Sequence, residues 1–160
     1  MAEINYTGTI ISDTDKNGMI TSANDVFQTV AGYTQDELIG ANHNIVRHDD
    51  MPRACFKLVW DTIRAGKEIR AFVINQAKNG DHYWVLAHIT PTSDGYHAER
   101  VAPNAATIND VVAPLYKQMR DKEKEMNCSN EGMEAATQIL LDVLADKGLS
   151  YDELIDALTA

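Results

Sequence analysis

Two strand-like segments around a short polar turn constrain the fold of this chain more than any other feature. Residues 69–77 and 82–90 are rich in β-branched and aromatic side chains, and Lys78-Asn79-Gly80-Asp81 separates them. A connection this short joins antiparallel strands, because parallel strands need a crossover of a dozen or more residues. The sequence therefore predicts an α+β fold with an antiparallel sheet, and not a doubly wound parallel sheet.

Further turn and strand patterns lie on both sides of this hairpin. Residues 8–22 predict two short strands around Asn17-Gly18, where both turn residues can take positive φ. Residues 96–102 predict a last strand after a turn at Asp94-Gly95. The expected order is two strands, helices, and then three strands paired as antiparallel hairpins.

Three helical patterns lie between the first two strands and the long hairpin, at residues 23–32, 34–40 and 54–66. In the second, Thr34 and Glu37 have the spacing of a capping box. In the third, apolar residues recur at intervals of three and four, which places them on one helical face.

The end of the chain is helical and acidic. Residues 129–148 form an amphipathic helical pattern, and Ser150 with Glu153 predicts a capping box for a last helix. We expect a sensor domain over residues 1–118 and an acidic helical C-terminal extension over residues 119–160.

Charge excludes two classes of partner. The net charge is −10, and residues 121–160 contribute −7 of it from ten acidic and three basic side chains. Such a surface repels phosphate backbones, so neither nucleic acid nor an anionic membrane is an expected partner.

Other features place the chain in the cytoplasm. It has no run of about 18 apolar residues that would insert into a membrane, and no basic segment followed by an apolar one at its N-terminus. Cys55 and Cys128 follow no metal or redox spacing, and two free thiols are expected in a reducing compartment. No metal site and no motif for catalytic turnover is evident, so the chain is not expected to be an enzyme.

The stretch "HNIVRHDDMP" combines charged and imidazole side chains with two aliphatic ones. This combination is unusual both for a plain surface loop and for a core segment. Arg47 offers a planar fork suited to phosphate oxygens, and His48 beside it can donate as well. Asp50 could orient Arg47 or accept a hydrogen bond from a ligand, while Ile45 and Val46 would line an apolar part. The alternative is an ordinary ion pair of Arg47 and Asp50 that braces a loop.

Two longer strings, "ITSANDVFQTVAGYTQDELIG" and "KNGDHYWVLAHITP", resemble PAS sensor domains over about residues 8–118. The resemblance implies a PAS fold: a five-stranded antiparallel sheet with short helices on one face. "HNIVRHDDMP" is similar to the H-N-x-V-R-H-P-D-M-P segment in the PAS domains of bacterial aerotaxis receptors. Those domains hold FAD non-covalently, and its redox state is reported to a chemotaxis signalling domain.

The resemblance implies roles for several residues. It makes Arg47, His48 and Asp50 the leading FAD contacts, with Trp60 as an aromatic wall. The sequence departs from the family at Asp49, where proline is usual. A carboxylate there would repel a diphosphate unless it points to solvent.

Asn75 lies in the middle of a predicted strand, where asparagine is disfavoured. It resembles an asparagine that light–oxygen–voltage PAS domains use to hydrogen-bond the flavin ring, although Val85 stands where those domains have a second one. The alternative is an edge position that faces water. His43 stands where those domains have their reactive cysteine, so no photochemical adduct is expected. His43, Asn44 and Asn24 complete the candidate cofactor-binding set.

The predicted function is a flavin redox or oxygen sensor that signals through conformational change. An outward-facing row of Trp84, Leu86 and His88 would pass the change to a signalling protein in trans, or to a second copy in a homodimer. One alternative is a haem gas sensor with His43 or His48 as iron ligand. Another is a cofactor-free PAS module for protein interaction.

Overall fold

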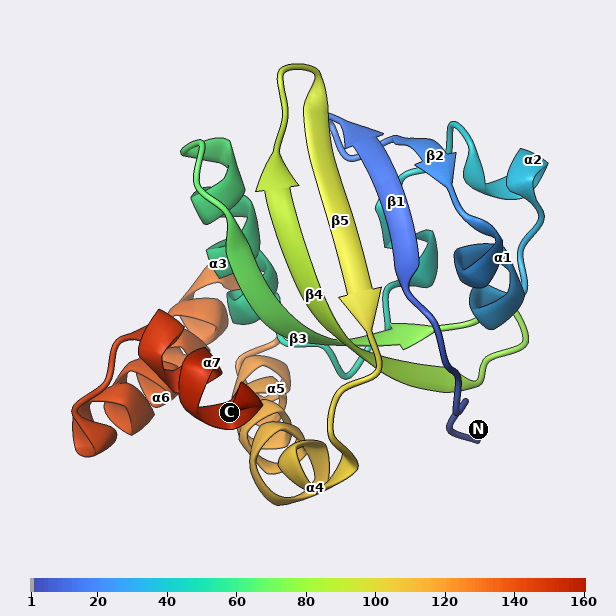
Figure 1. Cartoon of the computed structure of the whole chain (residues 1–160). Coiled ribbons are helices and arrows are strands. Elements are labelled where there is room, and N and C mark those ends of the chain that lie inside the picture. The colour runs from blue at the N-terminus through green and yellow to red at the C-terminus, as the bar shows by residue number, and fades with distance from the viewer. Residues whose placement is uncertain (1) are drawn as a thin grey trace. The chain divides into compact units, whose positions relative to one another are not determined.

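The computed structural model describes residues 2–160. Its five strands form one antiparallel sheet in the order β2-β1-β5-β4-β3 (Figure 1). The strands are β1 (Ile10–Asp15), β2 (Ile20–Ala23), β3 (Ile69–Gln76), β4 (His82–Pro91) and β5 (Gly95–Val101). The predicted α+β class and the five-stranded antiparallel sheet are confirmed.

The helices begin and end close to the predicted caps. They are α1 (Asp25–Ala31), α2 (Gln35–Leu38), the 3₁₀ turn η1 (His43–Val46), α3 (Arg53–Arg64), α4 (Ala105–Thr107), the π-helical η2 (Ile108–Val112), α5 (Ala113–Glu125), α6 (Asn130–Lys147) and α7 (Tyr151–Thr159). Both predicted capping boxes are present, at Thr34 with Glu37 and at Ser150 with Glu153. None of the helices within residues 2–160 is long and apolar enough to cross a membrane.

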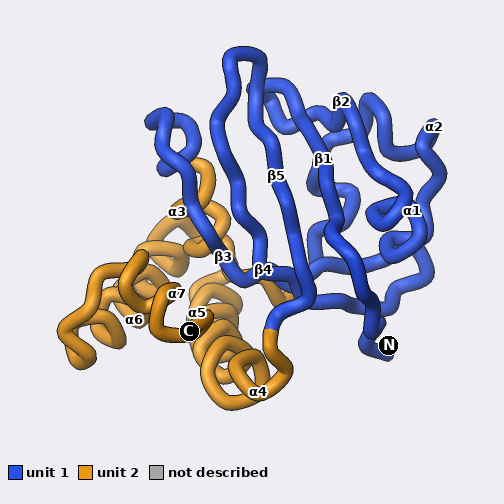
Figure 2. The backbone as a smooth tube through the Cα atoms, in the orientation of Figure 1, with its two compact units in different colours: residues 1–48, 62–103 blue, residues 49–61, 104–160 orange. Residues whose placement is uncertain are grey.

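The chain divides into two compact units (Figure 2). The first unit comprises residues 1–48 and 62–103 and contains the whole sheet with α1, α2 and η1. The second unit comprises residues 49–61 and 104–160 and contains most of α3 with the helices from α4 to α7.

The turn between β1 and β2 differs from the predicted one. Gly18 has φ +83°, but Asn17 is not among the residues with positive φ. The Asp15 N–H donates to the Met19 carbonyl at 2.9 Å, and the Gly18 N–H donates to the Asp15 carbonyl at 3.2 Å. This is the pattern of a longer hairpin loop in which one glycine takes the left-handed conformation. The prediction that both turn residues take positive φ is wrong, because the loop needs only one such residue.

Strand register assigns the side chains to the two faces of the sheet, since side chains directly opposite each other share a face. One face, which we call the inner face, is buried over most of its area, and its end at Thr14, Ile89 and Tyr96 is half-buried. Its buried members include Ile10, Ser12, Ile69, Ala71, Val73, Asn75, Tyr83, Val85, Ala87, Ala98 and Arg100. An asparagine and an arginine are unusual on such a face, and they mark where a functional site could be.

The opposite face carries the row that the sequence predicts to point outward. Trp84, Leu86 and His88 alternate along β4 with inner-face residues. Trp84 and Leu86 are half-buried, whereas the His88 side chain is exposed and lies 3.5 Å from the carboxylate of Glu68.

Candidate functional site

The 3₁₀ turn η1 follows α2 after a connection over residues 39–42, and local hydrogen bonds shape it. The Asn42 side chain caps η1 by accepting from the Asn44 N–H at 2.9 Å, and the Arg47 N–H donates to the Asn44 carbonyl at 2.9 Å. Val46 is buried, while Asn44 and Arg47 are exposed. Arg47 then forms an isolated antiparallel bridge with Asn75 on the edge strand β3. The structure therefore brings two of the predicted contact residues together.

Asn75 points inward. It is 5% exposed, lies opposite Tyr83 on β4, and its side chain hydrogen-bonds with Tyr83. Burial raises the pKa of Tyr83 far above its ordinary value, so this phenol stays neutral. The alternative of a water-facing Asn75 is wrong, because the register places it on the inner face.

His43, the first residue of η1, lies against the inner face as a neutral acceptor. Its Nε2 is 2.9 Å from Nη2 of Arg100 and 3.4 Å from Oγ of Ser12, and its ring lies 5.6 Å from that of Phe27. Burial, and secondly the charge of Arg100, lower the pKa of His43 to about 3. Since a guanidinium only donates, Nε2 must accept, and the proton of the neutral ring is on Nδ1.

Arg100 is a buried charged residue of the inner face that was not predicted from the sequence. It is 6% exposed, its Nη1 donates to Oγ of Ser12 at 3.0 Å, and its guanidinium lies 5.9 Å from the centre of the Phe27 ring. Burial lowers its pKa to about 10, which leaves it charged at neutral pH. The available signal was the alternation of Ala98 and Arg100 in the last predicted strand, which puts an arginine on the same face as a small apolar residue.

The other predicted contacts are spread over both units. In the first unit His48 is half-buried, and its ring lies 6.0 Å from that of His82 in an edge-to-face arrangement. In the second unit Asp50 is exposed, and Trp60 is half-buried on α3. Within residues 2–160, no group of three or more histidine, cysteine, aspartate or glutamate side chains could hold a metal ion.

Asn24 serves the backbone. Its Oδ1 accepts from the N–H groups of Phe27, at 3.0 Å, and Ile11, at 3.1 Å, and its Nδ2 donates to the Thr9 carbonyl at 2.8 Å. It therefore caps α1 and joins that helix to β1. We assign Asn24 a structural role and leave it out of the proposed contact set.

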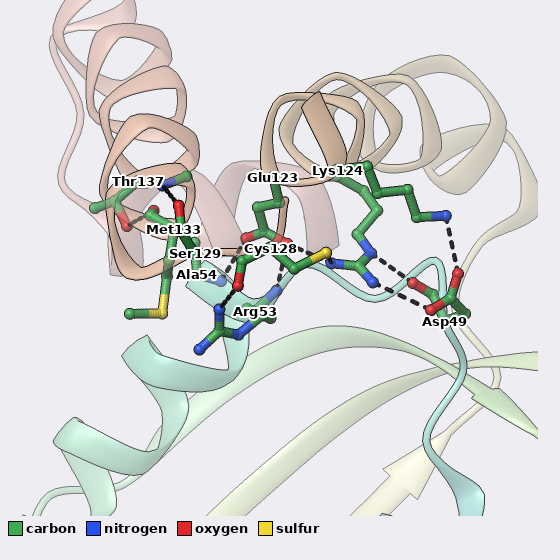
Figure 3. Close-up of polar contacts among 11 residues, drawn as sticks. Asp49, Arg53, Ala54, Glu123, Lys124, Cys128, Ser129, Met133 and Thr137 are labelled. Carbon is green, nitrogen blue, oxygen red and sulfur yellow. Dashed lines mark hydrogen bonds and ion pairs between the residues drawn. The ribbon is translucent and has the colours of Figure 1, made fainter. Parts of the chain in front are cut away.

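Asp49, which follows His48 in the chain, is paired by cations from α5 (Figure 3). Its carboxylate is 3.1 Å from Nη2 of Arg120 and 2.8 Å from Nζ of Lys124, and its carbonyl accepts from Nε of Arg120 at 2.7 Å. The hydrogen bonds from Lys124 and then Arg120 lower the pKa of Asp49. The Asp49 side chain is 74% exposed, so it meets the condition of pointing to solvent, and its charge is matched.

Glu123, also on α5, caps the beginning of α3 (Figure 3). One carboxylate oxygen accepts from the Arg53 N–H and the other from the Ala54 N–H, each at 2.9 Å. Nη1 of Arg120 adds a contact of 3.1 Å, and the Arg53 guanidinium donates to the Cys128 carbonyl. Since a helix start leaves N–H groups unpaired, this fully buried carboxylate fixes where α3 begins, directly after the "HNIVRHDDMP" stretch.

Comparison with known proteins gives a consistent picture. A family model of the PAS fold matches residues 2–100. The aerotaxis receptor of Escherichia coli (strain K12) is 45% identical over 116 residues, which are 68% of this chain and 22% of the receptor. The nitrogen fixation regulatory protein of Klebsiella pneumoniae is 35% identical over 81 residues, which are 51% of this chain and 16% of that protein. The chain thus spans about a fifth or less of the length of these relatives.

Solved structures show the same fold. A light–oxygen–voltage domain studied with a flavin analogue superposes with a TM-score of 0.58 at 19% identity, covering 68% of this chain and 85% of that one. The light-state Aureochrome1 LOV domain gives a TM-score of 0.57 at 16% identity, covering 68% of this chain and 90% of that one. At this level of identity the likeness concerns the fold alone.

Proposed function

The chain belongs to the PAS family, and on that basis we propose that it is a cytoplasmic FAD-binding redox or oxygen sensor that signals to a partner. The relation to the aerotaxis receptor supports the sensor class. The observation that carries the cofactor proposal is the inner face, where Asn75 and Arg100 are buried among apolar residues. Ligand sites combine an apolar surface with a few aimed polar groups in this way.

The available groups fit the chemistry of FAD. Its ring system is flat and largely apolar with a polar edge, which suits Val73, Val85 and Ala87 beside Asn75 on the inner face. Its diphosphate needs donors, and the exposed Arg47 has the required planar fork. When bound, FAD supplies reversible electron uptake, while the protein supplies binding and orientation.

Each predicted contact has a proposed part. In the first unit, Arg47 and His48 bind the diphosphate, Asn75 hydrogen-bonds the ring edge, and His43 and Asn44 border the site. The roles of Asp50 as a ribose acceptor and of Trp60 as an aromatic wall stay predictions for the second unit. Asp49 does not oppose the diphosphate in this account, because Arg120 and Lys124 match its charge.

The geometry favours flavin over haem. An iron ligand needs an imidazole nitrogen with a free lone pair. The Nε2 of His43 already accepts from Arg100 at 2.9 Å, and His48 follows the phosphate-suited Arg47 in the chain.

Arg47→Ala is expected to weaken FAD binding roughly 10- to 100-fold, the effect of losing a hydrogen bond between charged groups. Titration of flavin-depleted protein with FAD, followed by fluorescence, measures this. Lys16→Ala is the matched control, because it removes one exposed positive charge from the turn after β1. Equal affinities for wild type and Arg47→Ala would contradict the role of Arg47. Equal weakening by both substitutions would assign the effect to net charge alone.

The outer row of β4 is the proposed route to a second copy of the chain or another signalling protein. Trp84→Ser is expected to reduce self-association in sedimentation velocity while flavin content stays at the wild-type level. Loss of flavin in this variant would place Trp84 in the cofactor site instead.

A further inference from the structure

Arg100 is a buried cation without a counter-charge. Among the ion pairs of residues 2–160, none includes Arg100, and its hydrogen-bond partners are the hydroxyl of Ser12 and the neutral ring of His43. Arg120 shows the usual solution in the same chain, because its buried guanidinium contacts both Glu123 and Asp49. Burying a charge is unfavourable by several kcal/mol unless an opposite charge or a strong set of hydrogen bonds offsets it.

Packing does not explain why an arginine occupies this position. Its neighbours across the sheet on the inner face are Ile10 and Ala87, and Phe27 lies over its guanidinium. An aliphatic side chain would suit such neighbours without any desolvation of charge. Ser12 and His43 instead hold the guanidinium in place by accepting two of its hydrogen bonds. The arrangement resembles a binding site for negative charge more than a core contact.

We propose that Arg100 is the counter-charge for the reduced cofactor, donating to the carbonyl edge of the flavin ring and favouring its reduced, anionic form. This inference rests on the proposed function. A bound flavin would accept two electrons from an external reductant together with one proton from solvent, which would leave a net negative charge on the ring that a second proton would remove. A fixed positive charge beside the ring therefore stabilises the product that carries one proton.

The other titratable groups around Arg100 remain neutral, so they do not offset its positive charge. His43 lacks a proton on Nε2 at neutral pH, and the phenols of Tyr6 and Tyr83 keep theirs because burial raises both pKa values. Within the described cluster of Arg100, His43, Tyr6 and Tyr83, Arg100 therefore carries the charge.

The test compares the midpoint potential of bound FAD in wild type and Arg100→Gln during reduction with dithionite. The variant is expected to bind reduced FAD at least tenfold more weakly relative to oxidised FAD, which lowers a two-electron midpoint by about 30 mV or more. Arg100→Lys should recover most of the difference. Arg70→Gln, on the opposite face of the sheet, is the matched control and should keep the wild-type potential.

A second measurement needs no variant. At pH values where free FAD takes up two protons on reduction, the bound cofactor is expected to take up one. Its midpoint should then fall by about 30 mV per pH unit, and not by about 59 mV. Wild-type protein that binds FAD but takes up two protons would overturn the role of Arg100, and so would an unchanged potential in Arg100→Gln. Wild-type protein that binds no FAD would overturn the proposed function and this inference together.

Discussion

Replacing Glu123 with alanine is expected to destabilise the second unit by about 3 kcal/mol or more. The substitution leaves the N–H groups of Arg53 and Ala54 without their acceptor, and it removes the buried partner of Arg120. Breaking a buried ion pair from one side typically costs about 3–5 kcal/mol, and each unsatisfied buried donor costs about 1–3 kcal/mol. Urea unfolding, followed by circular dichroism of the helices, measures the loss.

Two further substitutions identify the cause. Glu123→Gln keeps one acceptor oxygen, so its loss should be intermediate. Glu125→Ala on the same helix removes an exposed carboxylate that pairs with Lys122, and it should change stability by no more than about 0.5 kcal/mol. Equal, small effects of Glu123→Ala and Glu125→Ala would show that Glu123 does not cap α3.

Lowering the pH from 7 to 4 is expected to destabilise the first unit by about 3 kcal/mol through His43 alone. The pKa of His43 is about 3 in the folded state, against about 6.5 in an unfolded chain. Between these values the unfolded state binds more protons, so stability rises with pH. The contribution is complete above about pH 6.5 and is lost as the pH falls towards 3, at about 1.4 kcal/mol per unit.

The measurement is the free energy of unfolding at several pH values in wild type and His43→Gln. Carboxylates also titrate in this range, so the difference between the two proteins isolates the histidine. Wild type should lose more stability on acidification than the variant. His88→Gln, at an exposed position, should behave like wild type. Parallel pH profiles for wild type and His43→Gln would contradict a half-buried His43 that stays neutral in the folded state.

Short-range signals in the sequence were reliable guides to the fold. The capping boxes at Thr34 and Ser150 depend on residues three positions apart, and both form as predicted. The segment before α5 had no predicted helix, and its helical structure begins at Ala105. Asn104 caps this first turn through its side chain, and the π-helical segment η2 connects it to α5. No periodic pattern in the sequence indicates a π-helix.

Features that depend on tertiary contacts could not be predicted from the sequence. Glu123 lies in a segment of charged residues, yet it is fully buried. Its carboxylate oxygens accept hydrogen bonds from the first N–H groups of α3, about 70 residues earlier in the chain. Arg100 required the strand register, since only pairing with Ile10 and Ala87 places it on the inner face. Arg47 and Asn75 were both predicted, but their backbone bridge was not.

The absorption spectrum of the purified protein is the first measurement to make, because it shows whether this PAS domain holds FAD. We expect the bands of oxidised flavin, their bleaching by dithionite, and release of FAD on denaturation, identified by chromatography. A Soret band would instead indicate haem. A featureless spectrum that persists after incubation with excess FAD would contradict FAD binding and leave the chain as a PAS interaction module.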